Sequence, residues 1–311
     1  MAHSTTYPAP DVASLNIRIA FRDENASEEM REAAERTVGA LVMRHMEATR
    51  RRREAEAEMA ETAAAYSAPV MRLIASDPAA AQAAEVIGSA RPLDGMMDSL
   101  GRHMSPETAV AAAPPQARQL PPYHFSWSWH DTNGYAPYNQ LLGMNNGALG
   151  LDARSGSAPG GKNGFVNAHA GFGLSLTTDH DVTARGVSFR RMRWSYKVGA
   201  YGAGGNATSE GGMEFTAFED GNLIAATDNR LDRLWRSRVS ASVFSPYEVD
   251  EGAAGPYAVD VPYELHFPMK PGRGYTFNVG AWVFSDYSSG AGAAGTQSFM
   301  EGHVHALTVW K

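Results

Sequence analysis

The chain has 311 residues, of which 43% are hydrophobic and 20% are charged, a composition typical of a globular protein rather than a disordered one. A formal net charge of −7 argues against a nucleic-acid-binding protein, because neutralising phosphates requires an excess of basic residues. The absence of cysteine excludes disulfides, thiolate metal sites and a cysteine nucleophile.

The first residues have neither the basic segment nor the apolar segment of a secretory signal. No apolar run is long enough to cross a membrane as a helix. We therefore expect cytoplasmic synthesis without membrane insertion, with any release from the cell taking place as part of a particle.

The first predicted element is a single β-strand at residues 14–21, inside an N-terminal arm of residues 1–24. Leu15, Ile17, Ile19 and Phe21 alternate with other residues and give the strand one apolar face. A lone strand must pair, because its backbone groups need hydrogen-bond partners. The strand joins either the sheet of its own chain, which we favour, or the sheet of a neighbouring subunit.

Residues 25–104 are predicted to be helical. Asn25 and Glu28 resemble a capping box, and an apolar face follows at helical spacing. The proline at position 69 predicts a stop near residues 67–69, so this helix would have about 40 residues and a length of about 60 Å. Such a length is typical of a coiled coil or an extended arm. The apolar face comprises Met30, Ala34, Val38, Leu41, Val42 and Met46.

Two shorter helices and a linker are predicted next. Ser76-Asp77-Pro78 is a helix start, and this second helix would end near Gly88. A third short helix is predicted over 94–103. Residues 105–122 are rich in proline and alanine, which predicts an extended, semi-rigid linker and a domain boundary.

Residues 123–311 are predicted to form an all-β domain. Aromatic and aliphatic residues alternate with period two, as at Phe125, Trp127 and Trp129. Glycine-rich segments predict loops, and one short helix is expected from Asn229 to Trp235. The predicted fold class is therefore α+β in two parts, with a long N-terminal helical arm and a C-terminal antiparallel sandwich or jelly roll. The predicted loops are residues 143–164, 199–212 and 287–299.

The strongest candidate metal ligands are Glu301, His303 and His305. Residues two apart on a strand share a face, so the three side chains could point the same way. Imidazole and carboxylate are suitable ligands for zinc, iron or manganese. The comparison with cupins fails in detail, because no further glutamate or second histidine strand follows. Two ordinary strand histidines are the simpler interpretation.

A ligand-binding surface is the second possibility. Trp282 lies on the strand face opposite Val279 and Val283, which makes it a candidate for a second packed surface or a stacked sugar. Asp131 and Asn133 belong to an Asp-Thr-Asn-Gly segment that predicts a turn between strands and could fix sugar hydroxyls or calcium.

This architecture favours assembly over catalysis. We expect a non-enzymatic structural or surface-binding protein without a cofactor, acting in an oligomer of the fibre, spike or decoration type found in virus-like and phage-like particles. Its partners would be copies of itself, other assembly subunits or a surface glycan. A carbohydrate-binding β-sandwich module and a metal-dependent jelly-roll enzyme are the alternatives. The residues expected in assembly contacts are Leu15, Ile17, Ile19, Phe21, Val38, Leu41 and Val42.

Overall fold

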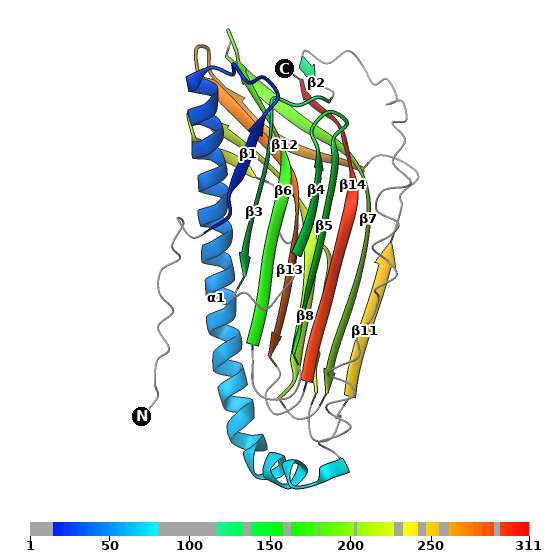
Figure 1. The fold of residues 1–311 in the computed structure, drawn as a ribbon. Helices are drawn as coiled ribbons and strands as arrows, with labels where there is room; N and C mark the ends of the chain where they lie inside the picture. The colour runs from blue at the N-terminus through cyan, green and yellow to red at the C-terminus, as the bar shows by residue number, and fades with distance from the viewer. Residues whose placement is uncertain are drawn as a thin grey trace.

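A computed structural model gives the arrangement of the helix and the strands (Figure 1). It describes residues 15–79, 117–119, 121–132, 138–157, 163–179, 181–201, 204–226, 233–241, 247–254, 261–288 and 293–310. The predicted third helix, most of the predicted second helix and the first part of the predicted linker lie outside the described residues.

The long helix α1 (Glu28–Ala75) begins close to the predicted position. Ser27 is its N-cap, because the Ser27 hydroxyl accepts a hydrogen bond from the Met30 N–H at 3.3 Å, a role that the sequence had indicated for Asn25. The predicted stop is wrong, because the helix continues through Pro69. Figure 1 shows its C-terminal part bending beneath the sheets, as expected where a proline removes a backbone hydrogen bond.

The strands form two seven-stranded sheets in which every described pairing is antiparallel. The first sheet has, in spatial order, β1 (Arg18–Phe21), β3 (Phe125–Thr132), β6 (Asn163–Thr177), β13 (Gly274–Ser288), β8 (Asn206–Glu219) and β10 (Arg233–Ser240), with β9 (Asn222–Ala226) beside β8. The second has β11 (Tyr247–Ala254), β7 (Val182–Tyr201), β14 (Ala293–Trp310), β5 (Ala148–Ser157) and β4 (Tyr138–Gly143), with β12 (Val261–Met269) beside β7 and β2 (Ala117–Gln119) beside β14.

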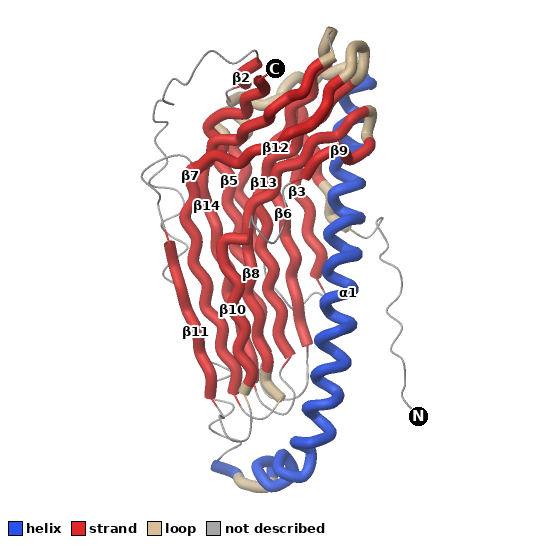
Figure 2. The backbone as a smooth tube through the Cα atoms, turned by 180° about the vertical axis from the view of Figure 1, so that it is seen from behind, coloured by secondary structure: helices blue, strands red, loops and turns tan. Residues whose placement is uncertain are grey.

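The two sheets pack face to face, which is consistent with a β-sandwich, and α1 runs along the outer face of the first sheet (Figures 1 and 2). The main core lies between the sheets and includes Phe172, Phe215, Phe277 and Met300. A second core lies between α1 and the first sheet, where Val38, Leu41 and Val42 of the helix pack with the aromatic side chains of β3. The first half of α1 is therefore a third layer of the β domain rather than a separate arm.

The N-terminal strand β1 pairs with β3 of its own chain, with Phe21 opposite Phe125 and Ile19 opposite Trp127. This is the arrangement that we favoured from the sequence. Leu15, Ile17, Ile19 and Phe21 pack against the second core. All seven residues expected in assembly contacts therefore lie in one intramolecular cluster.

Three sequence predictions within the β domain need correction. Arg233–Trp235 belongs to β10 and not to a helix, because Trp235, Ser237 and Val239 face inward with period two. Much of the glycine-rich segment 143–164 is strand β5, and much of 199–212 belongs to β7 and β8. Ala117–Gln119, inside the predicted linker, pairs with β14 as β2. In β8, Gly211 gives room to the Trp235 ring of β10.

No helix of the described residues is long and apolar enough to cross a membrane.

Candidate functional site

A cluster of buried polar side chains lies between α1 and the first sheet. His45 comes from the helix, His169 from β6 and Glu214 from β8. Glu214 lies between the two histidines, with Oε2 at 2.7 Å from His45 Nε2 and Oε1 at 3.0 Å from His169 Nδ1. All three side chains are buried. Within the described part of the chain, they are the group of histidine and acidic side chains whose ligand atoms approach one another closely enough to hold a metal ion.

Local sequence places each member of this cluster. His45 follows Val38, Leu41 and Val42 at helical spacing and continues the buried face of α1. On β6 and β8, His169 and Glu214 point outward from the sheet, opposite to the inward-facing residues Ala168 and Met213. The buried face of α1 is apolar at Val38, Leu41 and Val42, and on the next turn it carries His45, which contacts Glu214.

Aromatic rings enclose the cluster. The Trp129 ring stacks on His169 with centroids 4.1 Å apart and an interplanar angle of 12°. The ring centroids of His45 and His169 are also 4.1 Å apart, and those of Trp282 and His169 are 6.4 Å apart. The two histidines and Glu214 are therefore surrounded by apolar surface, where an uncompensated charge is costly.

Burial acts in opposite directions on the pKa values of His169 and Glu214. Burial, followed by positive charge at His45, lowers the pKa of His169 to about 4, although the charge of Glu214 and its hydrogen bond act in the opposite direction. Burial alone would raise the pKa of Glu214, but positive charge at the histidines and their hydrogen bonds to it outweigh burial and lower that pKa. Glu214 is therefore an ionised carboxylate that requires positive charge beside it.

A hydrogen-bonded pair supports His169 from the other side. The Asn167 amide group donates to the Thr49 hydroxyl at 3.0 Å, and its oxygen lies 3.1 Å from His169 Nε2. Because an amide oxygen only accepts, this arrangement places the proton of a neutral His169 on Nε2. The lone pair of Nδ1 then faces Glu214.

A second buried carboxylate lies four residues before Glu214 on the same strand. Glu210 of β8 is only 1% exposed and is close to three guanidinium groups: Arg52 at 3.2 Å, Arg236 at 3.1 Å and Arg233 at 3.8 Å. Arg52 also lies over the Phe284 ring, at 4.6 Å from its centroid. Arg52 therefore joins α1 to β8 and β13 at once.

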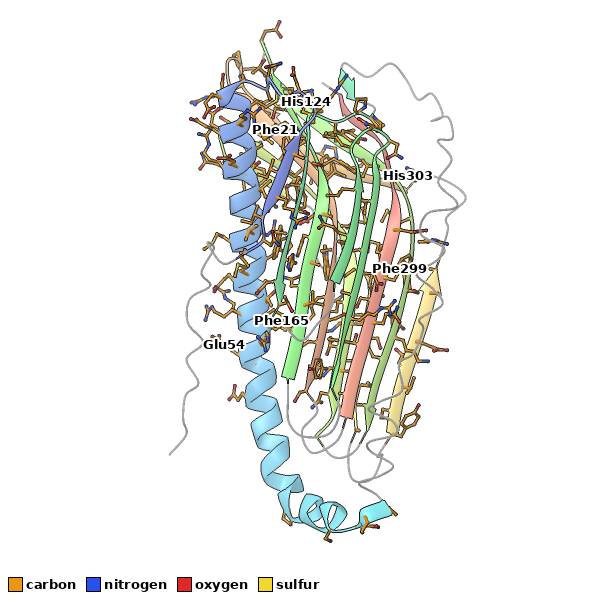
Figure 3. All side chains as sticks on the ribbon, viewed as in Figure 1. Phe21, Glu54, His124, Phe165, Phe299 and His303 are labelled. Atoms are coloured by element: carbon orange, nitrogen blue, oxygen red, sulfur yellow. The ribbon has the colours of Figure 1, made fainter. Side chains whose placement is uncertain are left out.

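The contact between the helix and the sheet spans most of the length of the strands. Figure 3 labels Phe21 near one end of this contact and Phe165 near the other. Arg31 lies over the Phe21 ring at 4.8 Å, and Arg53 lies over the Phe165 ring at 4.0 Å. The exposed side of α1 carries ion pairs from Glu47 to Arg50 and Arg51, which contribute little to stability.

Two of the three predicted metal ligands on β14 have other contacts. Glu301 forms an ion pair with Arg193, and His303 Nδ1 lies 3.4 Å from the carbonyl oxygen of Asn146. The register between β14 and β7 shifts between Val304 and Ala306, which breaks the regular alternation at His305. The side chain of His305 lies outside the described residues.

Two of the predicted ligand-binding residues, Trp282 and Asp131, lie on the two strands that flank β6. Trp282 does face outward from the first sheet, as predicted, but it is only 6% exposed and packs with Phe165 and Phe284. Asp131 ends β3 opposite Asn167, and Asn133 lies outside the described residues. Burial raises the pKa of Asp131, with Arg53 acting in the opposite direction.

Comparisons with known proteins do not place the chain in a family, because no family model and no curated protein matches it. Among solved structures, an isomalto-dextranase of Arthrobacter globiformis T6 complexed with panose is 12% identical, with 60% of this chain and 36% of that chain covered and a TM-score of 0.14. The structure of infectious bursal disease virus, Gx strain, is 10% identical, with 65% and 47% covered and a TM-score of 0.13. The chain spans less than half the length of either, and similarity this low carries no argument.

Proposed function

We propose that this protein is a non-enzymatic structural or surface-binding protein that acts in an oligomeric assembly of the fibre, spike or decoration type. The observation that supports this proposal is the extension of α1 past the ends of the strands (Figures 1 and 2). With 48 residues the helix is about 72 Å long. The contacts that its described side chains make with its own sheet lie in its first half.

The division of the helix follows the burial of its side chains. Buried positions recur from Ala34 to Thr49, and Arg52 and Arg53 make the last described contacts with the first sheet. A helix that leaves its packing surface has little intrinsic stability in water. Packing against a second copy of the chain would stabilise the remaining part, which includes alanines and Met59 in its sequence.

This mode of assembly differs from the one expected from the sequence. The residues first expected in assembly contacts already fill the intramolecular core beneath α1, so the interface moves to residues 54–75. A sandwich with helix-mediated association fits the proposed architecture, and a jelly-roll topology for the sandwich remains a proposal.

The test is the absolute mass of the full chain, measured by light scattering on a sizing column over a range of concentrations. The proposal expects a stable oligomer that Met59→Glu weakens, because a charge within a helix-to-helix contact is costly. Met43→Glu is the matched control, since Met43 is 48% exposed on the first half of the helix. A monomer at every concentration, or equal weakening by both variants, would refute the proposal.

A further inference from the structure

The arrangement of His45, His169 and Glu214 matches the ligand set of a transition-metal ion. Three separate elements supply the ligand atoms, which all lie within 4.8 Å of one another. A zinc ion with ligands at about 2.0–2.1 Å in a tetrahedron would hold neighbouring ligand atoms about 3.4 Å apart. The 2.7 Å and 3.0 Å contacts of Glu214 with the histidines need only small side-chain shifts to reach that spacing.

The hydrogen-bond pattern around His169 favours a cation at this position. Thr49 fixes the Asn167 amide, and the Asn167 oxygen accepts the proton of His169 Nε2. Nδ1 lies 3.0 Å from Glu214 Oε1, where either a proton on Nδ1 or a metal ion between the two atoms would join them. Metal-binding histidines characteristically donate their other N–H to an oxygen in this way.

The donors and the surroundings suit zinc or a similar ion. His45 Nε2, His169 Nδ1 and one oxygen of Glu214 offer three donor atoms, the number that the protein supplies in zinc sites whose fourth position is filled by water or another ligand. The Trp129 and Trp282 rings keep the surroundings apolar, where the metal charge would compensate the carboxylate. The chain has no cysteine thiolate, and this cluster offers only nitrogen and oxygen donors.

We propose that His45, His169 and Glu214 bind a divalent transition-metal ion of the zinc type that fastens α1 to the first sheet. The ion would join the helix to β6 and β8, so its binding energy would stabilise the docked helix. Asn167 and Thr49 are positioning residues that orient His169. The site consists of other residues than the proposed assembly surface at 54–75 and the polar residues on β14.

The first experiment is elemental analysis of protein that is produced without a histidine tag in zinc-supplemented medium. We expect close to one ion per chain, and cobalt-supplemented medium should give the visible absorption of tetrahedral cobalt. Glu214→Gln and His169→Gln should lose the ion. Glu301→Gln and His303→Ala are matched controls on β14 and should retain it.

The folded state of each variant is checked by near-ultraviolet circular dichroism. If the site variants do not fold, the wild type alone decides, because its melting temperature should fall on chelation and recover with zinc. Two results would overturn the proposal: wild type that holds no stoichiometric ion and shows no zinc-dependent melting, or folded Glu214→Gln that retains as much metal as the control Glu301→Gln. In either case a proton, not a metal, would occupy the cluster.

Discussion

Replacing Gly171 by alanine should destabilise the packing of α1 on the first sheet. Gly171 lies on the outer face of β6, directly opposite Trp127 of β3 and Gly280 of β13. A methyl group there would meet the Trp127 ring at 2.6 Å, the Gly280 Cα at 2.7 Å and the backbone oxygen of Val279. Two of these neighbours belong to the backbone of a buried strand and cannot turn away.

The magnitude follows from two opposing effects. Overpacking a well-packed core typically costs about 1–3 kcal/mol, and the backbone contacts favour the upper part of that range. Alanine also restricts the unfolded chain, which contributes about 0.4–1 kcal/mol in the opposite direction. The free energy of unfolding should therefore fall by about 1–2 kcal/mol, and Trp127 should be displaced toward the helix.

Gly39→Ala is the matched control, because it adds the same methyl group to α1. A Cβ atom at Gly39 would meet nothing within 4 Å. Inside a helix this change should stabilise the protein by about 1 kcal/mol. The same chemical change thus has opposite signs at the two positions.

Urea unfolding monitored by tryptophan fluorescence measures both variants. Trp127 and Trp129 are fully buried, so displacement of the helix should also shift the native emission to longer wavelength. If Gly171→Ala were as stable as the wild type, the close packing of Trp127 against β6 and β13 would be wrong. The inferred helix–sheet contact would then lose its main support.

Two further predictions concern charged groups. Glu210→Gln should lower the free energy of unfolding by about 1–3 kcal/mol, because it removes the charge of a buried carboxylate that three arginines share. Glu47→Gln on the exposed side of α1 should unfold close to wild type in the same urea titration. His124 Nδ1 accepts the Ser175 N–H at 3.2 Å, and burial, followed by the charge of Arg22, lowers its pKa from 6.5. The unfolded chain therefore binds this proton first as pH falls, so stability should decrease below about pH 6.5. His124→Asn, which can still accept that hydrogen bond, should lose less, and equal losses in urea midpoint for both proteins would contradict this reasoning.

The sequence predicted the elements whose periodicity is strong. The alternation of Phe125, Trp127 and Trp129 correctly indicated a strand, although it did not show that this face would be covered by the chain's own helix. The apolar face of α1 was also correctly predicted through Met46. Both predictions rest on side chains that repeat along a single segment.

Neither β6 nor the first part of β8 was predicted from the sequence, for a physical reason. Gly171 and Gly173 interrupt the outer face of β6 because Trp127 and Phe125 occupy that space from β3. Residues 165–177 were therefore not assigned to any element, although the inward residues of β6 from Val166 to Leu174 keep a period of two. That alternation was the available signal.

The polar cluster itself could not be predicted from spacing. His45, His169 and Glu214 come from three separate segments that are brought together by strand order and by the docking of α1. On the sequence, each is a single polar residue in an otherwise ordinary context. Glu301, His303 and His305 on β14 were predicted as metal ligands instead, because they occupy alternate positions close together in the sequence.

The buried polar contacts also determine how α1 lies on the sheet. Apolar contacts through Val38 and Leu41 are not directional and would tolerate a small slide of the helix. Contacts from His45 to Glu214 and from Arg52 to Glu210 are directional and join two positions of α1, two turns apart, to one strand, so a shift by one turn would break both. They fix the translation and rotation of the helix, and with it the direction in which residues 54–75 leave the sheet. The buried site and the proposed assembly surface are thus connected through one rigid element, and loosening the first should misorient the second.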